Sequence, residues 1–227
     1  SAASDVYKRQ MQILKEDFAG FDAQLIIMDV VPWMLPYYEA SGIQFEIEDN
    51  RDYMDYTFTP EQFLAGMDTQ DDRYRYNYFK RRFAYETEEI TPFHREEIRE
   101  FMEREWCGEK TCEECHCGCL LRVIDNLVPV FDKIRINGIL VRVEGKMAGL
   151  CIVSCRNGLG VYQYKNAVNR IKGINEYLLR ESFERYLQSA DTINYTEDMG
   201  VENLRYYKEH MAPAHTLLSK LTLTERG

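Results

Sequence analysis

The order of strands and turns toward the C-terminus constrains the fold of this chain more than any other feature. Two tight turns, Glu144-Gly145-Lys146 and Arg156-Asn157-Gly158, separate short apolar runs, which predicts three consecutive antiparallel strands. Helical periodicity begins at Gly173, and strand and helix alternate after it. The predicted elements are strands at 139–143, 147–154 and 160–164, a helix from 173, a strand at 192–195, a helix at 200–210 and a strand at 215–223. This order predicts an α/β fold built on a mixed sheet.

Composition and charge narrow the classes of protein to consider. The chain has 227 residues, of which 45% are hydrophobic and 29% charged, and this suits a folded domain. The net charge is −10, because 38 acidic residues outnumber 28 basic ones, and this excludes a basic protein that coats nucleic acid. No uncharged apolar run approaches the ~20 residues that cross a bilayer, so we expect no membrane span. Seven cysteines without a secretory signal favour a reducing, cytoplasmic location.

The loop before the helix at 173 carries a motif that points to a family of folds. Residues 170–175, RIKGIN, are similar to the Q/R-x-x-G-x-G/A loop of the GNAT acyltransferase superfamily, with Asn175 at the position of the small residue. The order of strands and helices resembles the same superfamily. The resemblance implies that strands 160–164 and 192–195 are parallel and diverge, with an acyl donor in the gap. A helix N-terminus suits a pyrophosphate, which makes Arg170 and Gly173 candidates for donor binding.

A longer motif follows downstream. Residues 193–213, INYTEDMGVENLRYYKEHMAP, are similar to the segment IN-x-x-x-D-x-G-x-x-x-LR-x-x-K in the C-terminal domain of phosphatidylglycerol lysyltransferases and their bacterial relatives. The matching residues are Asn194, Asp198, Gly200, Leu204, Arg205 and Lys208. Thr196 stands where that family usually has Glu. Residues 50–63, NRDYMDYTFTPEQF, resemble the segment before the family's second acyltransferase-like unit, and residues 75–77 loosely match its K-R-N-rich segment.

The resemblance implies a domain organisation, because these relatives are tandem duplications of the fold. Residues 1–10 have neither an initiator Met nor the apolar stretch of a signal peptide, and we expect them to be a non-native tail. Residues 11–70 then form the C-terminal part of a first GNAT-like unit. Residues 71–227 form one complete unit.

Three polar residues near the strand at 192–195 are the candidate catalytic group. Asn194, Glu197 and Asp198 lie where a strand ends and a helix begins, which is where open sheets usually contact ligands. We expect Asp198 to hold a substrate ammonium or to relay a proton, and Asn194 to orient a carbonyl. The alternative is that Asp198 caps the helix, with Glu202 in its first turn.

Cations in two places are candidates for binding the donor. Arg205 and Lys208 lie three residues apart and share a helix face, so they could contact phosphate or the 3′ end of a tRNA. Residues 73–85 mix five basic residues, among them Arg75, with aromatic side chains that could stack on a tRNA acceptor end. The alternative for both places is a solvated surface, with the aromatic side chains of 73–85 in the core.

A cysteine-rich loop supplies the residues that could bind a metal. These are Cys112, Cys115, Cys117 and Cys119. Their spacing is compressed for a tetrahedral zinc site, and no second, distant C-x2-C pair exists, so free thiols are the alternative and we expect no metal. Cys151 and Cys155 lie in the apolar stretch GLCIVSC and are expected to be small core residues.

The resemblance implies a transferase that moves an aminoacyl or acyl group to an amine or hydroxyl acceptor, which is a small molecule or a lipid. Such folds act by positioning the donor carbonyl and stabilising the developing oxyanion. The candidate donors are aminoacyl-tRNA and acyl-CoA. Two alternatives stay open. One is an acetyl-CoA-dependent N-acetyltransferase, and the other is a catalytically silent binding module, which Asn175 and Thr196 favour.

Overall fold

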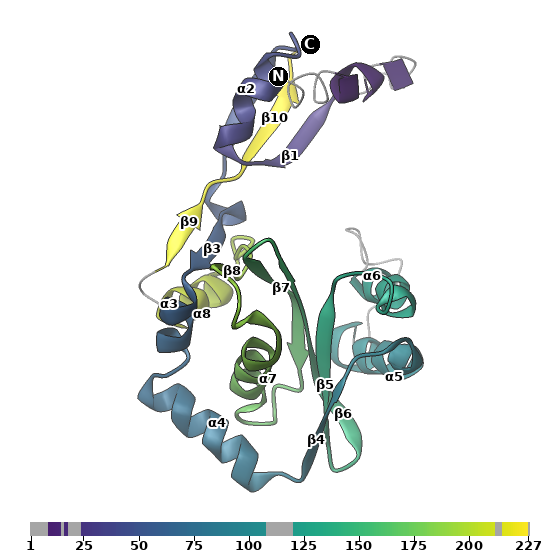
Figure 1. The fold of residues 1–227 in the computed structure, drawn as a ribbon, viewed down its shortest axis with the longest axis vertical. Coiled ribbons are helices and arrows are strands. Elements are labelled where there is room, and N and C mark those ends of the chain that lie inside the picture. The colour runs from purple at the N-terminus through teal and green to yellow at the C-terminus, as the bar shows by residue number, and fades with distance from the viewer. Residues whose placement is uncertain (1–8, 15, 18–23, 108–119, 212–214, 227) are drawn as a thin grey trace. The chain divides into compact units, whose positions relative to one another are not determined.

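The computed structural model describes residues 9–14, 16–17, 24–107, 120–211 and 215–226 (Figure 1). The fold is mixed α/β, as the sequence predicts, and it divides into two compact units. Unit 1 consists of Ser1–Tyr56, Glu197–Lys208 and Thr216–Gly227, and unit 2 consists of Thr57–Thr196 and Glu209–His215. The proposed duplication, with residues 11–70 and 71–227 as its two parts, stays a prediction. In the described part of the chain, no helix is both long and apolar enough to cross a bilayer.

Unit 2 contains the predicted antiparallel trio at the centre of its sheet. Neighbouring strands of the sheet follow the order β4 (Tyr85–Glu89), β5 (Asn137–Val143), β6 (Lys146–Arg156), β7 (Leu159–Ala167), β8 (Thr192–Asn194) and β3 (Asp55–Phe58). The first two residues of β3 belong to unit 1. β4 to β7 pair antiparallel, whereas β7 pairs parallel with β8. The buried side chains of β5 and β6 form the core of the sheet, because both strands are buried over most of their length.

Helices cover both faces of this sheet (Figure 1). Helix α7 (Ile174–Ser182) lies on one face, and α5 (Arg95–Met102) and α6 (Leu120–Leu127) lie on the other. α5 buries Ile98, Phe101 and Met102, which recur at helical spacing. α3 (Pro60–Gly66) and α4 (Gln70–Arg82) precede β4, and Phe79 of α4 packs against Tyr177 of α7 at a ring-centroid distance of 4.9 Å.

The strands β7 and β8 are parallel, as the resemblance implies, and their contact is short. Their register pairs only Leu159, Gly160 and Val161 of β7 with the three residues of β8. β7 continues to Ala167 beyond the end of β8. The β6–β7 register also shifts between Ile152 and Val153, which places a β-bulge near residue 163. The residues of β7 beyond β8 therefore lie along an edge that β8 does not cover.

Unit 1 is built on a small antiparallel sheet of β1 (Ile26–Val30), β10 (Leu221–Glu225) and β2 (Phe45–Asp49), in that order. It also contains α2 (Leu35–Glu39) and the first residues of α8 (Glu202–Met211). Leu221 and Leu223 of β10 pack with Val30, Tyr38 and Ile43 in its core.

The predicted single strand at 215–223 is wrong. The chain forms β9 (Thr216–Leu218) and then β10, with Ser219 and Lys220 between them. The side chains of these two residues make polar contacts at the break: Ser219 donates a hydrogen bond to Asp49, and Lys220 contacts Asp55 at 2.9 Å and Asp29 at 3.5 Å.

Candidate functional site

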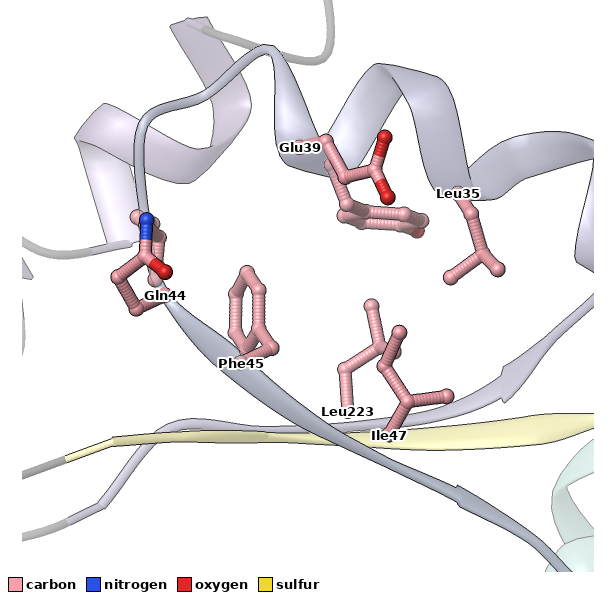
Figure 2. A pocket seen from close by; sticks show the side chains of 8 residues that line it. Leu35, Glu39, Gln44, Phe45, Ile47 and Leu223 are labelled. Atoms are coloured by element: carbon pink, nitrogen blue, oxygen red, sulfur yellow. The ribbon is translucent and has the colours of Figure 1, made fainter.

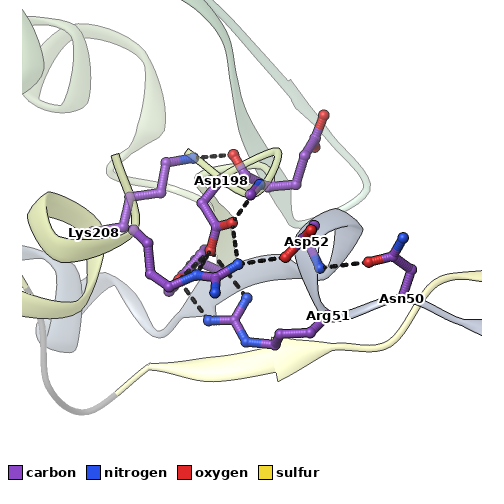
Figure 3. Close-up of polar contacts among 9 residues, drawn as sticks. Asn50, Arg51, Asp52, Asp198 and Lys208 are labelled. Carbon is purple, nitrogen blue, oxygen red and sulfur yellow. Dashed lines mark hydrogen bonds and ion pairs between the residues drawn. The ribbon is translucent and has the colours of Figure 1, made fainter. Parts of the chain in front are cut away.

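Asp198 lies at the centre of a polar cluster in unit 1 (Figure 3). We call Arg51, Asp52, Tyr56, Asp198 and Arg205 the Asp198 cluster. The Asp198 side chain is fully buried, and its Oδ2 accepts hydrogen bonds from Arg51 Nη1 at 3.0 Å, Tyr56 Oη at 2.7 Å and Arg205 Nε at 3.0 Å. Its Oδ1 accepts from Gly200 N at 3.0 Å and Arg205 Nη2 at 2.8 Å. Five donors therefore surround one carboxylate.

This arrangement keeps Asp198 ionised. Burial by itself raises the pKa of the Asp198 carboxyl, but the hydrogen bonds from Arg205, Tyr56 and the Gly200 N–H outweigh it, so the pKa lies well below its usual range. The hydrogen bonds that Arg205 donates to Asp198 and Asp52 in turn raise the pKa of Arg205. A carboxylate with so low a pKa is a poor proton acceptor near neutral pH. In this conformation Asp198 orients two guanidinium groups. The hydrogen bonds that its Oδ1 accepts from Gly200 N and Arg205 Nη2 also hold the turn before α8.

The two arginines remain accessible although their partner is buried. The Arg51 and Arg205 side chains are each 33% exposed, and Arg205 Nη2 also contacts Asp52 Oδ1 at 2.6 Å. Arg51 Nη2 donates to Tyr56 Oη at 2.7 Å. Guanidinium groups held in a fixed orientation suit the recognition of phosphate or carboxylate. The sequence prediction named Arg205 but missed Arg51 and Tyr56, although both lie in the segment 50–63 that resembles the family.

Glu197 and Lys208 differ in how far solvent reaches their side chains. Lys208 is buried, and its Nζ donates to the Glu197 carbonyl oxygen at 2.7 Å and lies 5.6 Å from the centroid of the Tyr56 ring. It therefore fastens the loop before α8 to the helix. The Glu197 carboxylate is 29% exposed and lies 3.4 Å from Lys220 Nζ, so of the two neighbouring acids it is the one that solvent reaches. Burial opposes the charge of Lys220, but Asp55 and the other acids raise its pKa overall.

Asn194 ends β8 in unit 2, at the last residue paired with β7. Its Oδ1 accepts a hydrogen bond from Thr196 N at 2.7 Å, and the side chain is largely buried. Thr196 has a φ of +58°. Asn194 thus marks the point where the two parallel strands separate and fixes the turn that follows.

The loop at the start of α7 keeps its glycine for a steric reason. Gly173 has a φ of +89°, and a Cβ there would collide with the carbonyl oxygen of Arg75 in α4. Asn175 accepts a hydrogen bond from Lys165 Nζ at 3.0 Å, and burial lowers the pKa of Lys165. Arg170 is 78% exposed and lies 3.8 Å from Glu105. The helix start is therefore present, and the buried amino group of Lys165 on β7 contacts it, which the sequence prediction missed.

Residues 73–82 lie on α4, and much of their charge is paired within the protein. Arg75 Nε donates to Asp71 at 2.7 Å, and Arg75 Nη1 lies 3.7 Å from Glu176. Phe79 is fully buried, and Tyr76 stacks on Tyr177 with ring centroids 5.9 Å apart. These contacts favour the structural alternative for most of the stretch. Tyr74, half exposed, has Lys172 Nζ 4.7 Å from its ring centroid and stays the most accessible aromatic side chain of the helix's N-terminal half.

The structure describes three of the seven cysteines: Cys107, Cys151 and Cys155. Cys112, Cys115, Cys117 and Cys119 lie outside the described residues. Among the residues that are described, no group of three or more His, Cys, Asp or Glu side chains could hold a metal ion. Cys151 is fully buried, and burial raises its pKa to about 11, which makes it an unreactive core residue as expected.

Comparisons with solved structures show the fold. A conserved protein of unknown function from Bacteroides thetaiotaomicron is similar with a TM-score of 0.78 and 23% identity over 96% of this chain and 75% of that one. L-PGS from Bacillus licheniformis has a TM-score of 0.69 and 14% identity over 98% and 75% of the two chains. A tandem GNAT protein from the clavulanic acid biosynthesis pathway has a TM-score of 0.54 and 10% identity over 97% and 68%. The fold is therefore GNAT-like.

The family follows from a separate comparison. No curated protein matches the chain. The family described as "Phosphatidylglycerol lysyltransferase, C-terminal" matches residues 3–219, which is nearly the whole chain. The resemblance seen in the motifs at 50–63 and 193–213 is thus confirmed, and the chain belongs to the phosphatidylglycerol lysyltransferase C-terminal family.

Proposed function

We propose that this protein transfers an aminoacyl group from aminoacyl-tRNA to an amine or hydroxyl acceptor, a small molecule or a lipid, in the cytoplasm. The observation that carries the proposal is the short parallel contact of β7 with β8, only three paired residues, beyond which β7 continues without β8, in a chain of this family. An uncovered strand edge can hold an extended donor through backbone hydrogen bonds. Asn194, at the point of separation, is the residue we assign to orienting the donor carbonyl.

The reaction itself needs no covalent enzyme intermediate. The acceptor nitrogen or oxygen attacks the ester carbonyl of the donor, the new amide or ester bond forms, and the bond to the ribose oxygen of the tRNA breaks. The acceptor loses a proton, and the ribose oxygen gains one. Positioning of the reactants supplies much of the rate enhancement in such transfers. We assign Glu197, the accessible acid, to contact with the acceptor or its proton, and Asp198 to positioning.

Arg205 and Arg51 are the residues to which we assign binding of the donor's phosphates. Further contacts with the donor are assigned to Arg170, Gly173 and Arg75. Lys208 acts through the loop that it fastens. Because the chain carries a net charge of −10, any binding of tRNA must come from local cationic groups and weaken with salt.

Binding measurements on the full chain test the donor. We expect charged tRNA to bind, with affinity that falls as salt rises, and acetyl-CoA not to bind. Arg205→Ala should weaken the binding of charged tRNA about tenfold, within the range expected for a charged hydrogen-bonded contact. Arg226→Ala is the matched control, because it removes one positive charge from the same unit at a side chain that is 61% exposed. Binding of acetyl-CoA alone would favour the N-acetyltransferase alternative, and binding of neither would favour a silent module.

A transfer assay tests the reaction. Loss of radiolabelled aminoacyl ester from tRNA is followed with amine acceptors and, separately, with phosphatidylglycerol vesicles. Glu197→Gln should reduce the rate with little change in tRNA affinity if Glu197 contacts the acceptor. An unchanged rate would remove Glu197 from the reaction.

A further inference from the structure

Unit 1 contains a pocket (Figure 2) whose lining includes no residue of the Asp198 cluster. It has a volume of about 180 Å³ and lies between α2 and the strands β2 and β10. Six of its lining residues are apolar or aromatic and two are polar: Leu35, Tyr38, Ile43, Phe45, Ile47 and Leu223, with Glu39 and Gln44. An apolar cavity of about 150 Å³ is large enough to bind benzene. The pocket therefore has room for one ring or a short branched chain.

The walls of the pocket are fixed by packing and strand register. Leu223 is 1% exposed, and Tyr38 and Ile43 are also buried, so all three belong to the core of unit 1. β10 and β2 pair Leu223 with Ile47 and Glu225 with Phe45, which sets Ile47 and Phe45 on one face of the sheet. A ligand would thus meet an existing surface and would not need to open the core.

The mouth of the pocket combines an exposed apolar side chain with an unpaired acid. Ile47 is 53% exposed, which leaves a large apolar surface in water. Glu39 ends α2, and no described residue forms a hydrogen bond or an ion pair with its carboxylate. Figure 2 shows Glu39 on the α2 side of the pocket, Gln44 and Phe45 next to each other at the start of β2, and Ile47 and Leu223 together on the strands.

The aromatic rings and the carboxylate that line this pocket favour a positively charged ligand. A cation near an aromatic face is attracted by the ring, and Tyr38 and Phe45 supply two such rings. The Glu39 carboxylate adds an attraction for the same charge and repels an anion. We propose that the pocket binds an organic cation, an ammonium group on a single aromatic ring or a short branched alkyl chain, with the apolar part against Leu223 and Ile47 and the ammonium at Glu39. This site is independent of the proposed transferase function.

Titration of methyl signals by NMR tests the proposal on the full chain labelled at Ile and Leu methyl groups. The probes are benzylamine as the cation, benzyl alcohol as a neutral analogue of the same shape and benzoate as the anion. We expect benzylamine to shift the methyl signals of Leu35, Ile43, Ile47 and Leu223 to saturation. Benzyl alcohol should shift them with severalfold weaker affinity, and benzoate should not shift them.

Substitutions separate the charge from the shape of the pocket. Glu39→Gln should weaken benzylamine about threefold to fivefold, the effect of one solvent-accessible ion pair, and leave benzyl alcohol unchanged. Glu48→Gln is the matched control, because Glu48 follows Ile47 on β2 and points to the other face of the sheet. It changes the net charge equally and should leave benzylamine unchanged. Equal affinity for the three probes, an equal effect of both substitutions, or no methyl shifts would overturn the proposal.

Discussion

Replacement of Asp198 by Asn tests the central feature of unit 1. The substitution keeps the shape of the side chain but turns one acceptor oxygen into an N–H donor. If that nitrogen takes the place of Oδ2, it faces three donors; if it takes the place of Oδ1, it faces two. Both orientations therefore leave buried donors without an acceptor and two arginines without their shared charge. Breaking a buried ion pair costs about 3 to 5 kcal/mol, and we take the lower end because both arginines are partly solvated.

Hydrogen exchange measured by mass spectrometry reports this loss locally. A loss of about 3 kcal/mol corresponds to a roughly hundredfold fall in protection, which we expect in peptides from residues 199–208 and 220–226 of unit 1. Asp52→Asn is the matched control, because Asp52 is 47% exposed and, among the described residues, forms its ion pair with Arg205 alone. It should cost no more than about 1 kcal/mol. Equal losses for the two variants, or full protection in Asp198→Asn, would refute the assignment of Asp198 as the centre of the cluster.

Acid dependence distinguishes the charge of Asp198 from its shape. In the folded chain the pKa of Asp198 lies below its ordinary value, so its carboxylate stabilises the fold above the ordinary carboxyl pKa of about 3.9. That contribution is lost as the pH falls from there toward the lower folded-state pKa. The stability difference between the natural chain and Asp198→Asn should therefore be constant from about pH 8 to pH 5 and smaller at about pH 3. A difference that stays constant to pH 3 would attribute the effect to shape.

Three further substitutions test how local backbone chemistry fixes unit 2. Gly173→Ala should lower stability by about 2 to 4 kcal/mol, because the residue has a φ of +89° and its Cβ would collide with the Arg75 carbonyl. Gly145→Ala is the control and should cost about 1 kcal/mol, because Gly145 has a φ of +75° but open space around it. Thermal melting that ranks the two variants the other way would contradict this reasoning. Thr59→Ala should cost about 1 kcal/mol, since Thr59 and Gln62 form a capping box at the start of α3; an unchanged melting temperature would show that the cap contributes nothing.

The antiparallel trio was predictable because its turns are encoded locally. Glu144 and Gly145 have φ values of +52° and +75°, and Asn157 and Gly158 have +51° and +78°. Gly145, Asn157 and Gly158 are of the residue types that suit the positive φ of two-residue hairpin turns, so the sequence itself shows where the strands reverse. The parallel contact of β7 with β8 was inferred from the family resemblance. The bulge near residue 163 was not inferred from the sequence, because it depends on how β6 and β7 pair and not on a residue pattern.

Contacts between distant residues explain what the sequence could not show. The strand at 215–223 has no proline or glycine to interrupt it, yet Lys220 meets acids from β1 and β3 and the strand breaks there. Likewise, Asp198 was singled out by its motif, but its donors Arg51 and Tyr56 lie 147 and 142 residues away in the chain. Without these partners, an accessible ligand-binding acid and a buried positioning acid have the same local pattern.

The family motif at 193–213 performs two separate physical tasks, because the boundary between the compact units falls inside it. Asn194 belongs to unit 2, where it ends β8 at the point of strand separation. Asp198, Arg205 and Lys208 belong to unit 1, where they order two guanidinium groups and the loop before α8. A change at Asn194 should therefore alter unit 2 without loosening the Asp198 cluster, and a change at Asp198 should do the reverse. A contiguous motif is thus no proof of a contiguous function, and each of its residues needs its own test.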